Sequence, residues 1–339
     1  MTERQLLEAA RRGDENAFAR LVEPDRGALH AHCYRMLGSV PDAEDALQEA
    51  LLNAWRGLPG FEGRSSLRSW LYSIATNASL RAIERRPKRV LPIDYAPAAD
   101  PHDGPAEPLV ESVWVEPYPD ERLGLEDGLA GPEARYEQRE SVELAFIAAL
   151  QHLPARQRAV LILRDVLGFT AREVARTLAT TPTAIDSALQ RAHKAVDERL
   201  PERSQQAALG SLDDERLREI VDGFIDAWER ADVGAVVALL ASDAAMTMPP
   251  LPTWYRGRQA IAAFLAAGPL RSDRRWRVVP VRANGQLAFG KYGWDEQRAT
   301  FTAHSISVLT LDGELIADFT TFLDAELFVR FGLPDEIEL

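Results

Sequence analysis

The sequence predicts a multidomain protein in which two all-α domains precede one α+β domain. Apolar side chains recur at helical spacing through most of residues 1–200, whereas strand-like alternation begins only near residue 276. Many prolines gather between residues 91 and 139 and separate the two helical parts. A chain of 339 residues is also long enough for two or three separate cores. Helices followed later by a sheet therefore indicate separate domains.

The expected boundaries follow from these patterns. Residues 1–90 form the first helical domain, 91–139 an acidic, proline-rich linker, 140–200 the second helical domain and 213–339 the α+β domain. Helices are predicted over residues 26–37, 41–57, 170–178, 213–231 and 258–267, with one more starting at Leu67 and another at Pro182. Strands are predicted over 276–281, 286–289, 301–309 and 315–319, with Asp312-Gly313 as a hairpin turn.

Composition limits the class of protein. The chain is 46% hydrophobic and 27% charged, as in soluble globular proteins, and no apolar run approaches the roughly 18 to 20 residues of a membrane span. The N-terminus has no apolar signal core, so a cytoplasmic protein is expected. Cys33 is the single cysteine, which excludes an internal disulfide. We interpret its neighbours His30 and His32 as ordinary helix residues, and we expect no metal site and no cofactor.

The net charge of −13 at first argues against DNA binding, which needs Lys and Arg to neutralise phosphates. By segment, however, the net charge is +2 for residues 1–90, −9 for 91–139, +1 for 140–200 and −7 for 201–339. The acidic excess thus lies in the linker and the C-terminal part. The two helical domains are near neutral, so any basic surface on them must be local.

Residues 170–194 have the pattern of a helix-turn-helix. Thr170 stands three residues before Glu173, a capping box that starts a helix, and Thr181 then caps a second helix with Pro182 at its first position. In this motif the second helix enters the major groove. Gln190 and Arg191 can reach base edges or phosphates, and Lys194 a phosphate. The candidate DNA-binding residues are Thr181, Thr183, Asp186, Ser187, Gln190, Arg191 and Lys194.

A second candidate DNA-binding region is the polar loop at residues 60–66 with the helix after it. Opening DNA requires a pocket, stacking surfaces and nearby cations to trap flipped bases. Trp70, taken by itself, fits a core position better than a stacking surface. Arg86 is a further candidate for a phosphate contact. The candidate DNA-binding residues of this region are Phe61, Arg64, Ser65, Ser66, Arg68, Asn77, Arg81 and Arg85.

Four segments, taken in their order along the chain, resemble bacterial RNA polymerase sigma factors of the extracytoplasmic-function (ECF) group of the sigma-70 family. These segments are Ala43–Glu49, Gly60–Leu71, Gly168–Ala175 and Thr181–Ile185. The resemblance covers residues 1–90 and 140–200. It implies that the helix after Thr181 reads the −35 promoter element and that the loop at 60–66 and the next helix recognise and melt the −10 element. It further implies that core RNA polymerase binds, with the β flap and β′ coiled coil as contacts. The acidic helix residues Asp42, Glu44, Asp45, Gln48 and Glu49 would bind the coiled coil.

The order of elements after residue 213 resembles the cone-shaped α+β fold of SnoaL-like polyketide cyclases and ketosteroid isomerases. A subgroup of ECF sigma factors carries such an extension together with a Trp- and Pro-containing linker motif, and residues 114–120 are similar in kind. The expected docking residues are Trp114, Pro117, Tyr118, Pro119 and Asp120. Local collapse of a disordered segment is the alternative. We favour a regulatory role, in which the extension docks on the DNA-reading domains or the linker.

Two other functions are compatible with parts of the sequence. The first is a cyclase- or isomerase-like enzyme tethered to a DNA-binding module, for which Trp228, Tyr255, His304 and Asp318 offer suitable residue types. Each of these also fits as an ordinary sheet or rim residue, and a fold by itself does not imply catalysis, so no enzyme activity is expected. The second is a helix-turn-helix repressor that acts without polymerase. An anti-sigma factor and a small apolar ligand stay open as partners.

Overall fold

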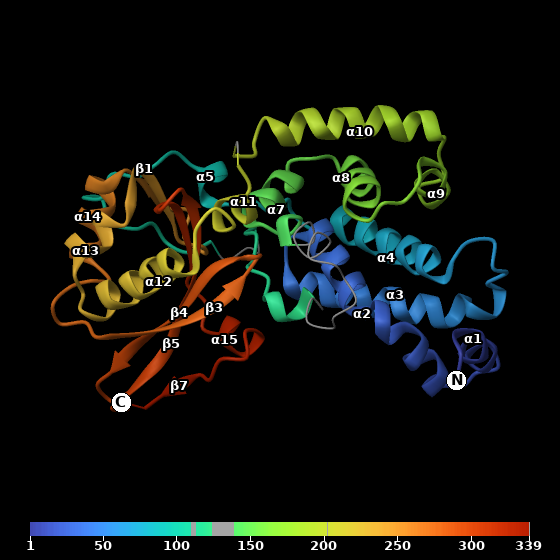
Figure 1. Ribbon diagram of the computed structural model, residues 1–339, viewed down its shortest axis with the longest axis horizontal. Helices are drawn as coiled ribbons and strands as arrows, with labels where there is room; N and C mark the ends of the chain where they lie inside the picture. The colour runs from blue at the N-terminus through green and yellow to red at the C-terminus, as the bar shows by residue number, and fades with distance from the viewer. Residues whose placement is uncertain (110–112, 124–138, 202, 339) are drawn as a thin grey trace. The chain divides into compact units, whose positions relative to one another are not determined.

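The structure is a computed structural model that describes residues 1–109, 113–123, 139–201 and 203–338 (Figure 1). The chain forms two compact units that do not follow chain order. The first unit comprises Met1–Arg89 and Glu121–Leu200, and the second comprises Val90–Asp120 and Pro201–Leu339. The predicted linker 91–139 is thus divided between the units. Its residues 110–112 and 124–138 lie outside the described residues.

The first unit begins with helices α1 (Glu3–Arg11), α2 (Glu15–Leu37), α3 (Val40–Gly57) and α4 (Leu67–Glu84), with the short η1 (Leu58–Gly60) between the last two. Thr2, Asp14, Ser39 and Ser66 cap the four helices by accepting a hydrogen bond from a backbone N–H three residues ahead. Helix α2 starts earlier than the predicted range 26–37 because it continues through Pro24. The apolar residues on both sides of Pro24 are buried and offset the lost hydrogen bond.

The rest of the first unit holds the second helical part: η2 (Asp120–Leu123, whose first residue belongs to the second unit), α7 (Leu144–Gln151), α8 (Ala155–Leu161), η3 (Ile162–Val166), α9 (Ala171–Thr177) and α10 (Pro182–Asp197). Helix α8 continues into η3 as a π-helical turn. Ile185, Ala192 and Val196 form the buried stripe of α10. Helix α10 packs mainly against α8 and α9.

Polar contacts join the two helical parts within this unit. The buried Arg35 of α2 donates to the carbonyl oxygen (3.1 Å) and the hydroxyl (2.7 Å) of Ser141. Arg158 of α8 donates to the carbonyl oxygen of Met36, and Gln151 donates to that of Arg35 at 3.3 Å. The ring of Phe169 also packs edge-on against Tyr72 of α4, with centroids 5.5 Å apart. These contacts make one packed unit of parts that lie far apart in the sequence.

The second unit has an α+β architecture. Its strands are β1 (Leu240–Thr247), β2 (Trp254–Arg256), β3 (Trp276–Ala283), β4 (Gln286–Asp295), β5 (Thr300–Asp312), β6 (Leu315–Phe322) and β7 (Glu336–Ile337). The sheet order is β2-β1-β6-β5-β4-β3, with β7 paired to β5, and β1 runs parallel to β6 while the other pairs are antiparallel. Its helices are α5 (Pro92–Tyr95), α11 (Gln205–Leu209), α12 (Asp214–Glu229), α13 (Val233–Ala238), α14 (Arg258–Ala267) and α15 (Leu327–Arg330). The structure confirms the predicted fold class, with helical domains first and a mixed sheet later.

The core of this unit lies between helix α12 and the sheet (Figure 1). Phe224 and Trp228 of α12 pack against the sheet, and the ring of Phe224 lies 4.5 Å from that of Phe289 on β4. Direct cross-strand partners share a face of a sheet, so Lys291 and Ser305 face this core together with Phe289.

Two tight turns define the antiparallel part of the sheet. Asn284 and Gly285 connect β3 to β4 with φ values of +57° and +70°, the left-handed conformation that a two-residue hairpin turn requires. Gly313, with φ +58°, helps connect β5 to β6, as the Asp312-Gly313 pair predicts. Within the part of the chain that the structure describes, no helix is both long and apolar enough to cross a membrane.

Candidate nucleic-acid interface

The helix-turn-helix is formed by α9 and α10. The Thr170 hydroxyl accepts a hydrogen bond from the Glu173 N–H (3.3 Å), and the Glu173 carboxylate accepts one from the Thr170 N–H (2.9 Å). The Thr170 hydroxyl also donates to this carboxylate at 2.7 Å, and this bond, together with that from the Thr170 N–H, lowers the pKa of Glu173. Ala179, with φ +49°, makes the turn, and the Thr181 hydroxyl then accepts from the Ala184 N–H at 3.3 Å. The predicted capping box and N-cap are both confirmed.

Helix α10 presents a polar face. Gln190, Arg191 and Lys194 are exposed, and Ser187 is half-buried. The predicted residues Thr181, Thr183 and Asp186 near the start of the helix are also exposed. Because Ile185 and Ala192 are buried underneath, the helix is fixed by its apolar face while its donors and acceptors stay accessible. Such a face can contact base edges and phosphates.

The loop before α4 is more closely packed than its sequence suggests. Phe61 is buried, and its ring lies 4.9 Å from that of the half-buried Trp70. Arg11 donates a hydrogen bond to the Phe61 carbonyl oxygen. In this conformation Phe61 is therefore a packing residue rather than an open stacking surface. Arg64 is exposed and pairs with Glu62 at 2.5 Å.

The serines of this loop shape the start of α4. The exposed Ser66 caps the helix by accepting from the Ser69 N–H at 3.1 Å, and the half-buried Ser65 hydroxyl donates to the Ser66 carbonyl oxygen at 3.3 Å. Both side chains thus take part in local hydrogen bonds.

The polar residues along α4 lie in different surroundings. The Arg68 guanidinium sits over the rings of Tyr72 (5.3 Å) and Phe169 (5.6 Å), a cation–π arrangement. Asn77 donates to the Ser73 carbonyl oxygen at 2.8 Å and is half-buried. Arg85 is exposed at the C-cap of the helix.

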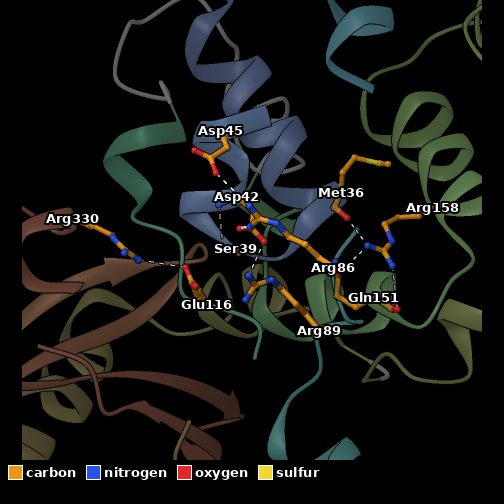
Figure 2. A network of polar contacts seen from close by, with 10 residues as sticks. All are labelled: Met36, Ser39, Asp42, Asp45, Arg86, Arg89, Glu116, Gln151, Arg158 and Arg330. Carbon is orange, nitrogen blue, oxygen red and sulfur yellow. Dashed lines mark hydrogen bonds and ion pairs between the residues drawn. The ribbon is translucent and has the colours of Figure 1, made fainter. Parts of the chain in front are cut away.

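The acidic helix α3 pairs with arginines of the same unit, as Figure 2 shows for Asp42 and Asp45. Asp42 is buried and pairs with Arg86 and, at 2.6 Å, with the buried Arg89. Arg86 also reaches Asp45 at 3.3 Å. A crevice of about 430 Å³ opens beside these side chains and is also lined by Arg158.

Two further acidic residues of α3 are paired in the same way. Glu49 accepts from Arg81 at 2.7 Å and Glu44 from Arg122 at 3.2 Å, whereas Gln48 is exposed. The predicted polymerase-binding acids are therefore neutralised in this conformation by arginines, two of which, Arg81 and Arg86, are predicted phosphate-binding residues. Only part of each predicted surface is open to a partner.

Residues 114–120 pack on the β3–β4 hairpin within the second unit. The Tyr118 N–H donates to the Asn284 side-chain oxygen (2.8 Å), and the Asn284 N–H donates to the Tyr118 carbonyl oxygen (2.8 Å). The Gly285 N–H donates to the Asp120 carboxylate at 2.7 Å. Trp114 Nε1 donates to the Pro250 carbonyl oxygen at 3.1 Å. The segment is held at both ends by directional hydrogen bonds.

Other contacts extend this attachment. Pro117 and Pro119 are buried, and Glu116 pairs with Arg330 at 3.4 Å (Figure 2). Upstream, the backbone N–H groups of Ala99 and Leu109 donate to the carbonyl oxygens of Trp254 and Pro250. The described residues between 90 and 120 thus run along the C-terminal domain rather than through solvent.

The residue types considered for an isomerase do not meet in one place. Tyr255 and Trp228 belong to the apolar core, where burial raises the pKa of Tyr255. Asp318 alternates with the core residue Phe319 on β6 and so points to the opposite face of the sheet. Burial raises the pKa of Asp318 to about 7, and burial with the nearby Lys291 charge lowers that of His304 to about 4.

The Asn-Gly pair at 284–285 was not anticipated as a functional position. An Asn-Gly pair between alternating apolar residues is the usual sign of a two-residue hairpin, so the turn itself was detectable. Its role in holding residues 118–120 depends on contacts across more than 160 positions, which no local pattern reveals. Lys291 and Arg158 were also missed, because burial of a charged side chain is decided by packing.

Comparison with known proteins agrees with this architecture. The Sigma-70 region 2 family matches residues 21–89, the Sigma-70 region 4 family residues 143–196, and the SnoaL-like domain family residues 221–319. The crystal structure of the Mycobacterium tuberculosis extracytoplasmic function sigma factor SigJ superposes with a TM-score of 0.55 at 21% identity, covering 92% of this chain and 98% of that one. This likeness supports the fold.

Relatives by sequence carry the family assignment. The ECF RNA polymerase sigma factor SigG of Mycobacterium tuberculosis (strain H37Rv) is 42% identical over 330 residues, which are 96% of this chain and 86% of SigG. The ECF RNA polymerase sigma-E factor of Escherichia coli K12 is 28% identical over 59% of this chain and 95% of its own length. With both sigma-70 regions matched in order and SigG similar over nearly the whole length, the chain belongs to the ECF RNA polymerase sigma factors.

Proposed function

We propose that the C-terminal domain regulates this sigma factor by holding the segment that joins its two DNA-reading domains. The protein binds core RNA polymerase and directs it to promoter DNA, as the family does. In addition, the described residues between 90 and 120 are an integral part of the C-terminal domain's surface. Its work takes place in the cytoplasm, where polymerase meets DNA.

The observation that carries the proposal is the attachment of Tyr118 and Asp120 to the Asn284-Gly285 turn. Promoter reading requires regions 2 and 4 to occupy two separate elements at once. The length of free chain between them limits the distances that they can span. By binding residues 114–120, the C-terminal domain shortens that free length.

In the same proposal, the exposed side chains of α10 read the −35 element, and the loop at residues 60–66 with α4 acts at the −10 element. The ion pairs of α3 with Arg81, Arg86 and Arg122 support a rearrangement on binding, since these acids must leave their arginines to face polymerase. The exposed pairs of Glu49 with Arg81 and of Glu44 with Arg122 are weak, about 0–1 kcal/mol each, so their exchange is feasible. Asp42 is buried, so its ion pairs cost more to break.

The test is specific transcription by reconstituted holoenzyme carrying Asp120→Ala or Asn284→Gly. Glycine keeps the left-handed turn but removes the acceptor for Tyr118, and alanine removes the acceptor for Gly285. We expect each variant to change promoter-specific initiation several-fold in the same direction. Asp103→Ala is the matched control, because Asp103 is an exposed acid of the same segment.

Unchanged initiation with both variants, together with unchanged initiation after deletion of residues 205–339, would refute the regulatory proposal. It would leave the sigma-factor assignment untouched. Hydrogen–deuterium exchange at residues 114–120 verifies that the variants detach the segment.

A further inference from the structure

The core of the C-terminal domain contains a buried lysine without a hydrogen-bonding partner. Lys291 on β4 is 1% exposed, and among the described residues its Nζ atom has no hydrogen bond and no ion pair. A buried charge that is neither paired nor hydrogen-bonded is costly, and native structures retain such groups for a reason. The chain has three lysines, Lys88, Lys194 and Lys291, against many more arginines, and it places one of these three here.

The immediate surroundings of Lys291 supply donors but little acceptor capacity. Its Nζ atom lies 3.7 Å from the ring centroid of Trp228, a cation–π contact that offsets part of the burial cost. Ser305, the cross-strand partner of Lys291, is fully buried, and its hydroxyl has no partner among the described residues. The Trp228 Nε1–H is likewise unpaired in that part of the chain.

A strand irregularity adds His304 to this cluster. The register of β4 and β5 shifts between the pairs Lys291–Ser305 and Tyr292–Ala303, so His304 is the extra residue of a β-bulge. Its ring contacts that of Trp276 edge-on at 5.0 Å, and Trp276 in turn contacts Trp228 at 6.0 Å. The His304 ring is partly buried against Trp276 while the residue keeps exposed surface, so the cluster reaches from the buried amine to the surface.

Among the residues that the structure describes, no carboxylate pairs with this amine. Asp318 of the same sheet faces away from the core, and the lowered pKa of Lys291, about 7, arises from burial alone. A buried cation beside a hydroxyl, an indole N–H and two indole rings matches the chemistry of a carboxylate attached to an apolar body. The carboxylate supplies the missing charge, and the aromatic rings contact the remainder.

We propose that the C-terminal domain binds an apolar carboxylic acid in its core, with the carboxylate on Lys291 and Ser305 and the apolar part against Trp228 and Trp276. The site is built on β4, the strand that begins at the Asn284-Gly285 turn. The proposed ligand site and the docking site of residues 114–120 therefore both lie on the β3–β4 hairpin, so ligand binding can affect docking. The coupling between ligand binding and docking rests on the proposed function, whereas ligand binding itself does not.

The test follows Lys291 directly in the full-length protein. With lysine labelled at the ε carbon, two-dimensional NMR gives three ε-methylene signals, assigned with Lys88→Arg, Lys194→Arg and Lys291→Met. The probes are sodium benzoate and octanoate, compared with sodium acetate and sodium chloride at equal ionic strength. We expect benzoate or octanoate to raise the titration midpoint of Lys291 by one pH unit or more. Lys88 and Lys194 serve as internal controls and keep their signals.

Variants decide whether the effect belongs to this site. Lys291→Met is nearly isosteric and should remain folded while losing at least nine-tenths of the affinity for the probe, and Ser305→Ala should weaken binding several-fold. Three outcomes overturn the proposal: no probe moves the Lys291 signal at up to tens of millimolar, acetate and chloride act as strongly as benzoate, or Lys291→Met binds as well as the parent. Transcription is not part of this readout, so its failure and that of the regulatory proposal are distinguishable.

Discussion

Individual charged residues in this protein serve different purposes according to their burial. Arg158 and Lys291 are both buried cations, but Arg158 donates to several carbonyl oxygens, whereas Lys291 has no hydrogen bond among the described residues. Burial lowers the pKa of Arg158 to about 10 and that of Lys291 to about 7. The arginine therefore stays protonated at neutral pH, while the lysine titrates there.

This difference predicts a pH-dependent stability that Lys291→Met removes. The unfolded chain binds a proton on Lys291 up to its ordinary pKa of 10.5, but the folded chain releases it above about 7. Between these values the unfolded state binds more protons, so the free energy of unfolding contributed by Lys291 rises with pH, by at most about 1.4 kcal/mol per pH unit. Below pH 7 the contribution is constant. His304, with its pKa near 4, stays neutral across this window.

Urea unfolding followed by tryptophan fluorescence, at several values between pH 6 and 9, measures the effect as the difference between the parent and Lys291→Met. A difference that does not change with pH would show that Lys291 is already protonated throughout, as an exposed lysine is.

At the scale of elements, α10 illustrates how a helix serves both packing and recognition. Its cap, its proline and its buried stripe fix the helix by local and nearby contacts. Gln190, Arg191 and Lys194 on the opposite face are exposed and do not belong to the buried stripe. Substitutions there should affect DNA binding without changing stability.

Arg191→Ala should weaken binding of the holoenzyme to its promoter by about 1–3 kcal/mol if the side chain contacts a base edge. The measurement compares the promoter with a scrambled −35 element by fluorescence anisotropy at fixed salt. Arg199→Ala, an exposed arginine just beyond the end of α10, is the matched control. An equal loss on both sequences would make Arg191 a phosphate contact.

At the scale of the whole molecule, the compact units cut across the order of the sequence. Regions 2 and 4 form one unit, and the segment between them is shared with the C-terminal domain. Arg158 is central to the first unit, because it donates to Met36 of α2 and to Gln151 of α7 (Figure 2). It also donates to the carbonyl oxygen of Leu153.

Arg158→Met should destabilise the packing of regions 2 and 4 by about 2–4 kcal/mol, since it leaves several buried carbonyl oxygens without donors. Hydrogen–deuterium exchange should accelerate at residues 34–38 and 141–153. Arg156→Met is the control: Arg156 lies on the same helix but bonds to Leu178, within region 4. Equal acceleration in both variants would assign the effect to region 4 alone.

Much of this organisation is determined by the sequence itself. Helix caps such as Thr170 and Thr181, the stripe of Ile185 and Ala192, and the later alternating strands are set by short-range chemistry, so fold class and the helix-turn-helix could be predicted. The strand β1 could not, because its pairing with β6 is parallel and joins residues more than 70 positions apart. The docking of Tyr118 on Asn284 could not be predicted from the sequence for the same reason, since these residues also lie far apart in the chain.

Burial and partnership were decided only by the tertiary structure. The sequence offers Phe61 as a possible stacking ring and Asp42 as a polymerase contact, and it does not single out Lys291. Packing instead places the first against Trp70, pairs the second with Arg89 and leaves the third buried beside Trp228. The local sequence pattern of caps, apolar stripes and alternating residues determines which helices and strands form. The free energy of a side chain depends on its neighbours in space, and those are chosen by the fold.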